Sequence, residues 1–257
     1  MTIKNIFNKI KLDNITIILG LFSMLIGYFK EFSIIIYLIV IHEIGHCLFA
    51  SLFNKNILKI NIYPFGGESL IDIKPSTKII YEIIILITGP LFQLLAAYVL
   101  INIANNLDEK ELIKNINNAL IVFNLLPIYS LDGGKIINNI LNIFLSIKKS
   151  FEISIIISYL TIIFIIIYFN KDISLSIIYM IIFLSIKTYK EISMYNYNYN
   201  SFMLDRFLNK YHFKDNKIVE NSKMYYRNKY NLVKNNDKYY TENDILIKKF
   251  GKSVDTN

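Results

Sequence analysis

Residues 32–53 of the chain read FSIIIYLIVIHEIGHCLFASLF, and this segment decides the fold class. It is long enough to cross a membrane, because a helix needs roughly 20 apolar residues to span about 30 Å of hydrocarbon. The segment also carries three ionisable side chains, His42, Glu43 and His46. Ionisable residues inside a membrane span are expensive and mark a functional site by default. The sequence therefore predicts a membrane helix that carries a functional centre.

The composition of the whole chain also favours a membrane protein. Hydrophobic residues make up 54% of the 257 residues, and the mean hydropathy is +0.40. An ordinary soluble domain needs a more polar surface. Candidate spans are predicted at Ile15–Tyr28, Phe32–Phe53, Ile79–Ile103, Asn115–Ser146, Ile153–Phe169 and Ile173–Ile186. We therefore predict an all-α polytopic membrane protein with about six transmembrane helices, the first of which is retained and not cleaved as a signal peptide.

Two regions depart from plain spans. The stretch from Asn56 to Ile73 alternates apolar and polar residues on either side of Pro64–Gly67, which is typical of a short hairpin or a re-entrant loop. The fourth span is interrupted at Pro127 and again at Asp132, which is followed by two glycines. A helix broken inside a membrane must line a cavity enclosed by protein. We expect a re-entrant hairpin and a broken fourth helix.

The basic residues predict the topology. Lysines precede the first span and follow the second and the fourth, and a Lys/Arg-rich tail follows the sixth. By the positive-inside rule, both termini lie in the cytoplasm. We expect an integral protein of the bacterial cell membrane, with a membrane-embedded core at residues 1–190 and a basic cytoplasmic tail or small domain at residues 191–257. The net charge of +8 reports this topology and comes with no nucleic-acid motif, so nucleic acid is not an expected partner.

Residues 42–46 form an HExxH sequence, which is a zinc-binding pattern. The four-residue spacing places His42 and His46 on one face of a helix, one turn apart, as two zinc ligands. Glu43 lies beside them and is the candidate general base. The third ligand must come from elsewhere, and Asp132 is the other ionisable side chain expected to be buried in a span. Asp132 by itself could equally be a helix N-cap or a turn residue.

The depth of the two motifs supports this pairing. In the predicted topology, the second and fourth spans both run from outside to inside, and both motifs fall in their later halves. The site is therefore expected toward the cytoplasmic leaflet. Cys47 follows His46 on another face of the helix, so we expect a small buried hydrophobe there and not a metal ligand.

These motifs carry a family resemblance, at His42–His46, Asn124, Pro127, Asp132 and Gly133. They resemble the site-2 protease family of zinc intramembrane proteases, with the closest likeness to the stage IV sporulation protein FB group, over roughly residues 10 to 190. The resemblance implies Zn²⁺ as cofactor, Asp132 as third ligand and Glu43 as base. It also implies that Asn124 positions substrate or stabilises an oxyanion; its other interpretation is a polar helix residue satisfied by a neighbour.

One position departs from the family pattern. Residues 89–92 read GPLF, which resembles the family's third-span motif, but Gln93 follows where asparagine is usual. The resemblance therefore does not predict which residue the amide of Gln93 contacts.

The expected function is zinc-dependent hydrolysis of a peptide bond in or near the membrane segment of a protein. The expected partners are a membrane-inserted or membrane-tethered protein substrate, the lipid bilayer and inhibitory membrane proteins. For the substrate, the resemblance suggests a sigma-factor precursor and a role in sporulation. A helical substrate must unwind before hydrolysis, and the alternating segment Lys59–Tyr63 could pair with it as an added strand.

Two alternatives stay open. A membrane zincin of another kind would take its third ligand from a Glu-x-x-x-Asp sequence on a later span, and the third to sixth spans contain none. A transporter or an inactive scaffold could retain the metal site without proteolysis. Glu43 argues against the scaffold, because binding alone requires no base beside the metal.

Overall fold

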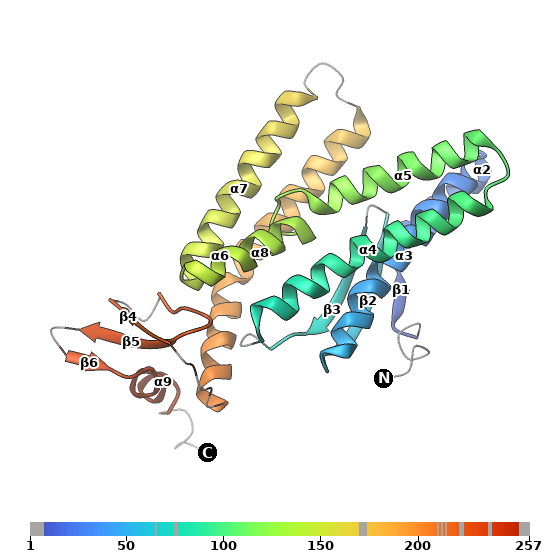
Figure 1. Cartoon of the computed structure of the whole chain (residues 1–257). Coiled ribbons are helices and arrows are strands. Elements are labelled where there is room, and N and C mark those ends of the chain that lie inside the picture. The colour runs from blue at the N-terminus through green and yellow to red at the C-terminus, as the bar shows by residue number, and fades with distance from the viewer. Residues whose placement is uncertain are drawn as a thin grey trace. The chain divides into compact units, whose positions relative to one another are not determined.

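The computed structural model describes residues 8–64, 66–74, 77–169, 174–209, 211, 213, 215–220, 224–235 and 238–251 (Figure 1). The chain divides into two compact units, one made of residues 1–73 and 80–125 and the other of residues 74–79 and 126–257. The units are described separately. Phe65 of the predicted Pro64–Gly67 turn and Ile173 at the start of the predicted sixth span lie outside the described residues.

The first unit combines four helices with a small sheet. Its elements are β1 (Ile10–Leu12), α2 (Asn14–Leu25), α3 (Phe29–Leu52), β2 (Asn56–Tyr63), β3 (Gly66–Asp72), α4 (Ile79–Ile103) and α5 (Leu107–Leu125). The segment with the HExxH sequence is therefore the 24-residue helix α3, as predicted.

The sheet of this unit has the order β1-β2-β3. β2 pairs in parallel with β1 and antiparallel with β3, so β2 is the central strand. Its buried side chains are Ile57, Ile60 and Ile62, which form a core with Ile39, Ile44 and Cys47 of α3. The three-residue interval from Ile57 to Ile60 breaks the two-residue alternation because the register shifts between Ile57 and Lys59. This core fixes the sheet against α3.

The central place of β2 corrects one prediction. Lys59–Tyr63 cannot take up a substrate strand, because β1 and β3 occupy both edges of β2. β3 is an edge strand of this sheet within the described part of the chain. The hairpin itself is present, whereas its re-entrant position in a membrane stays a prediction.

A glycine lets α3 and α4 approach closely. A Cβ on Gly45 would lie 2.7 Å from Thr88 O and 2.9 Å from Phe92 Cβ, so a larger residue would push the helices apart. Thr88 Oγ1 donates to Gly45 O across this contact, at 3.2 Å. Small residues and interhelical hydrogen bonds of this kind hold helices together in membranes, where no hydrophobic force acts between them.

The second unit is also mainly helical. Its elements are α6 (Asp132–Phe144), α7 (Ile147–Tyr168), α8 (Leu175–Leu208), β4 (Asn216–Val219), β5 (Tyr230–Asn235), β6 (Lys238–Tyr240) and α9 (Glu242–Phe250). The strands form a second sheet, in the order β4-β5-β6. The chain is thus mostly helical, but the prediction of an all-α fold is corrected by two three-stranded sheets.

The predicted break of the fourth span is present between α5 and α6. Residues 126–131 are not helical, and Tyr129 N donates to Ser158 Oγ of α7 at 2.8 Å. Ser158 continues a buried row of serines on α7, with Ser150 and Ser154, that share one face at four-residue spacing. α6 then begins at Asp132 itself, so the two following glycines lie in its first turn and not in the break.

Of the described helices, α3, α4 and α7 are long and apolar enough to span a membrane by length and composition. α2 is apolar but has only 12 residues. The predicted number of six spans therefore stays a prediction. The predicted domain boundary at residue 190 does so as well, and α8 runs through it without interruption.

The C-terminal part of the second unit has its own core and a buried ion pair. Phe202 and Met203 of α8 pack with Val219, Val233 and Leu246 of the sheet and α9. Beside them, Arg206 Nη1 lies 3.1 Å from Glu242 Oε1, and both side chains are buried.

Backbone groups complete this ion pair. Arg206 Nη2 donates to Lys229 O at 2.9 Å, and Asn231 N donates to Glu242 Oε2 at 3.1 Å. Burial lowers the pKa of Arg206, and the carboxylate of Glu242 acts in the opposite direction. The pair therefore ties α8, α9 and the 226–229 loop together.

We expect Glu242→Ala to destabilise the C-terminal region by about 3–5 kcal/mol, because it leaves the Arg206 charge buried without its partner. Limited proteolysis of the purified protein should show the tail opening at least about 100-fold more often, since each 1.4 kcal/mol is a factor of ten. Glu220→Ala, at an exposed position after β4, is the matched control and should cleave like the wild type. Equal cleavage rates for both variants would contradict the role of the pair.

Candidate active site

The two histidines of α3 are buried and held by their Nδ1 atoms. His42 is 3% and His46 5% exposed, and their ring centroids are 4.7 Å apart. His42 Nδ1 donates to Gln93 Oε1 at 2.9 Å, and His46 Nδ1 donates to Ile85 O at 2.7 Å. Both partners are oxygen acceptors, so each Nδ1 carries the proton in the neutral ring and leaves Nε2 as a lone-pair donor. Second contacts of this type orient metal-binding histidines.

Gln93, which stands where the family pattern has asparagine, makes two side-chain contacts. Its carbonyl oxygen accepts from His42, and its Nε2 donates to Asn117 Oδ1 of α5 at 3.1 Å. The amide is fully buried, and its Nε2 also lies 3.3 Å from Asn117 O. The result is a chain of hydrogen bonds from α5 through α4 to the ring of His42.

Gly89 of α4 provides the space beside the two rings. A Cβ at this position would lie 2.8 Å from His42 Nε2 and still closer to the ring of His46. Any side chain there would therefore collide with the Nε2 atoms of both histidines. The glycine therefore keeps the space beside these two nitrogens clear of a side chain.

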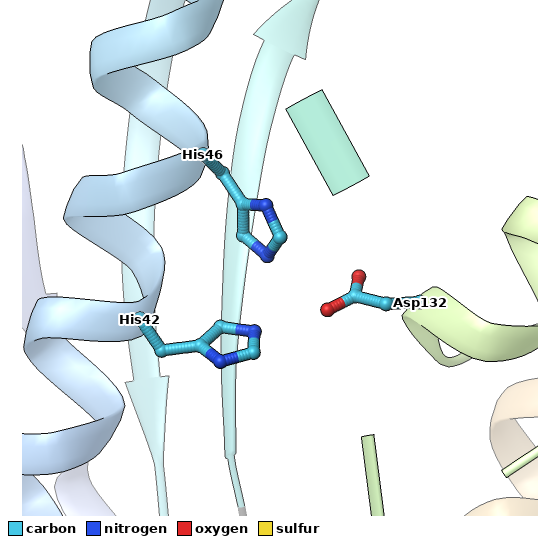
Figure 2. Close-up of side chains that lie close together, drawn as sticks. All are labelled: His42, His46 and Asp132. Carbon is cyan, nitrogen blue, oxygen red and sulfur yellow. The ribbon is translucent and has the colours of Figure 1, made fainter. Parts of the chain in front are cut away.

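Asp132 is the candidate for the third donor. The ligand atoms of His42, His46 and Asp132 all lie within 4.8 Å of one another, and Figure 2 shows the carboxylate facing the two rings. Two imidazole nitrogens and one carboxylate oxygen are a donor set that catalytic zinc takes, with a fourth position left open. Leu131, and not Asp132, is the N-cap of α6, which excludes the alternative of Asp132 as a cap.

Glu43 is buried against the sheet. Only 5% of it is exposed, and Ser69 Oγ of β3 donates to its Oε2 at 2.5 Å. Gly67, two residues earlier on the same strand, lies against the same carboxylate: a Cβ there would be 2.5 Å from Cδ and Oε1 of Glu43. The carboxylate is thus enclosed by two β3 residues on one face of the strand.

Several of these functional contacts were not predicted from the sequence. Ser69 and Gly67 lie in the predicted hairpin, but their contact with Glu43 depends on how the hairpin packs on α3. The only sequence signal is that they alternate on one face of a strand. Asn124 lies half-buried near the end of α5, and its proposed role stays a prediction.

No model of a protein family matches the chain. Among curated proteins, it is 25% identical to Stage IV sporulation protein FB of Bacillus subtilis over 199 residues, which are 75% of this chain and 69% of that protein. It is 32% identical to Zinc metalloprotease MJ0392 of Methanocaldococcus jannaschii over 111 residues, 40% of this chain and 32% of that protein.

A solved structure of a site-2 protease is also similar to the chain. The Site-2 Protease from Methanocaldococcus jannaschii matches with a TM-score of 0.56 and 27% identity, covering 71% of this chain and 89% of that one. The chain is a homologue of the site-2 proteases. The name of the second curated relative specifies zinc, and the donor set of this site-2 protease homologue fits that ion. These likenesses and the three apolar helices support an integral membrane protein.

The collision of a Cβ with both rings predicts the effect of Gly89→Ala. The added methyl group displaces the Nε2 atoms, so zinc affinity should fall by at least about tenfold, a loss comparable to that from removing a contact that orients a metal ligand. The zinc content of protein purified at limiting zinc measures this. Leu91→Ala, at an exposed position on the same helix, is the control and should retain zinc. Equal zinc content in the two variants would show that the site does not need the glycine.

Proposed function

We propose that the protein is an intramembrane zinc metalloprotease that hydrolyses a peptide bond in or near the membrane segment of a protein substrate. The observation that carries the proposal is the buried carboxylate of Glu43, which follows directly after His42 on the helix that carries two of the three candidate ligands. A site that only bound a metal would have no use for a buried carboxylate at this position, whereas hydrolysis requires a group that accepts a proton.

His42, His46 and Asp132 would hold the ion. When bound, Zn²⁺ acts as a Lewis acid on the scissile carbonyl and makes water a nucleophile at neutral pH. Glu43 takes a proton from the attacking water as the new C–O bond forms. It returns this proton to the amide nitrogen as the C–N bond breaks, which yields a carboxylate and an amine. Asn124 is proposed to position the substrate or to stabilise the oxyanion.

The substrate would be presented as an extended strand. A peptide bond in a helix is shielded by its own hydrogen bonds, so the substrate must unwind, and a free strand edge can then bind it through main-chain hydrogen bonds. β3 is the edge strand that also contacts the base, through Ser69. We therefore assign substrate pairing to β3, in place of the occupied central strand β2.

Disulfide cross-linking tests this assignment. In a Glu43→Gln background, Leu70→Cys on β3 should form disulfides with cysteines placed along a membrane-tethered substrate, at every second substrate position, because strand residues alternate between two faces. The native Cys47 is buried and does not compete. Leu58→Cys is the matched control, since Leu58 is also exposed but lies on β2. Cross-links from Leu58→Cys and none from Leu70→Cys would contradict the assignment.

The likeness to Stage IV sporulation protein FB supports a membrane-tethered regulator as substrate, and we propose a sigma-factor precursor as the first to examine. The basic loops and tail support cytoplasmic termini and a site toward the cytoplasmic leaflet. Inhibitory membrane proteins are further proposed partners. A transporter or scaffold that retains the metal site is not favoured, because the named relatives are proteases.

Glu43→Gln tests the reaction itself. It should bind zinc like the wild type, near one ion per chain, but cleave a membrane-tethered substrate at least about 1,000-fold more slowly, because it cannot accept a proton. Cleavage and zinc content are measured on the same preparations. Asp132→Asn should instead lose zinc. If Glu43→Gln cleaved like the wild type, or the wild type bound no zinc, the proposed function would be wrong.

A further inference from the structure

We propose that Ser69 is a positioning residue for the reaction: its hydroxyl on β3 holds the carboxylate of Glu43 in the one orientation in which it can accept and return a proton. This inference rests on the proposed function and adds to it a group that lies outside the HExxH sequence and the metal ligands.

The two side chains are joined by a direct hydrogen bond. Ser69 Oγ donates to Glu43 Oε2 at 2.5 Å. A second contact directs the hydroxyl proton. Cys47 Sγ donates to Ser69 Oγ at 3.4 Å, which leaves the hydroxyl proton for the two acceptors of Glu43, the near Oε2 and the more distant backbone O at 3.5 Å.

The backbone around Ser69 leaves this side chain little freedom to move. Ser69 is paired with Ile60 and Gly67 with Ile62 in the β2–β3 ladder. Ile60 and Ile62 are fully buried in the core that β2 shares with α3. The position of Ser69 relative to Glu43 is therefore set by packing between the sheet and the helix and not by a loop.

Gly67 limits where the carboxylate can go. The glycine gives Glu43 Oε1 the space that a Cβ would fill, while Ser69 binds Oε2. One oxygen is thus bound and the other is left beside a residue without a side chain. Without the serine hydroxyl, the carboxylate could rotate away from the reacting water, and a misplacement of about 1 Å can slow a reaction about 100-fold.

Kinetic comparison of Ser69→Thr and Ser69→Val tests the inference, because these two side chains have the same shape and differ in the hydroxyl. With a membrane-tethered substrate, Ser69→Thr should retain kcat to within about threefold, and Ser69→Val should lose about 10- to 100-fold. KM and the zinc content per chain should be unchanged in both. Ser69→Ala should behave like Ser69→Val. Ser33→Ala, at another serine hydroxyl and on the helix that carries Glu43, is the control and should cleave like the wild type.

Three results would overturn the inference. Equal kcat for Ser69→Thr and Ser69→Val would show that the hydroxyl is not needed. A loss of zinc in Ser69→Val, or a rise in KM with kcat unchanged, would show a structural role or a role in substrate binding instead. Glu43→Gln, measured in the same series, separates this failure from that of the proposed function. If Glu43→Gln is inactive and Ser69→Val is fully active, only the inference about Ser69 is wrong.

Discussion

The structure of the first unit depends on one requirement: three ionisable side chains of an apolar helix are buried, and each must have a polar partner. An unpaired polar group in an apolar environment costs several kcal/mol, and an unpaired charge costs more. α4 supplies the partners of the histidines, through Gln93 and the carbonyl of Ile85. β3 supplies the partner of Glu43, through Ser69. The helix with the HExxH sequence is therefore enclosed by the elements that satisfy it.

Three glycines make these contacts possible. The polar partners reach the buried side chains of α3 only where neighbouring backbones come close, and glycine allows this approach. Gly45 brings α4 against α3, Gly89 leaves room beside the two Nε2 atoms, and Gly67 leaves room for the carboxylate. Each of these glycines is explained by a contact with another element, and none of the three requires a positive φ. At these three positions glycine is needed because it has no side chain, and not because its backbone is flexible.

The sequence predicted the features that follow from local pattern. The HExxH helix, the hairpin around Pro64–Gly67 and the break at Pro127 each depend on spacing or on residues that interrupt regular structure within a few positions. Asp132 was identified because an acidic residue in an apolar span is costly. Features that depend on distant pairing were missed. β1 is three residues long and pairs with β2 some 50 residues later, so its own sequence carries almost no strand signal.

The partners of the site residues were missed for a related reason. Gln93 was noted only as a departure, since its contact with His42 depends on the crossing of α3 and α4. In the sequence, Ser69 is an ordinary polar residue of a hairpin, because its contact with Glu43 depends on the register between β2 and β3. The contacts within the tail could not be predicted from the sequence either. Its sheet and α9 form around Arg206 and Glu242, two charged residues that composition alone assigns to a solvated surface.

The edge of β3 connects the fold to the chemistry. An edge strand presents backbone N–H and C=O groups that need partners, and hydrocarbon cannot supply them. Such an edge is tolerated only where water or protein reaches it, and water is also the second reactant of a hydrolase. A substrate strand on this edge would satisfy the same backbone groups, beside the strand residue Ser69 that contacts the carboxylate of Glu43. The sheet would then serve three needs of proteolysis in a membrane: access of water, an extended substrate, and a fixed carboxylate.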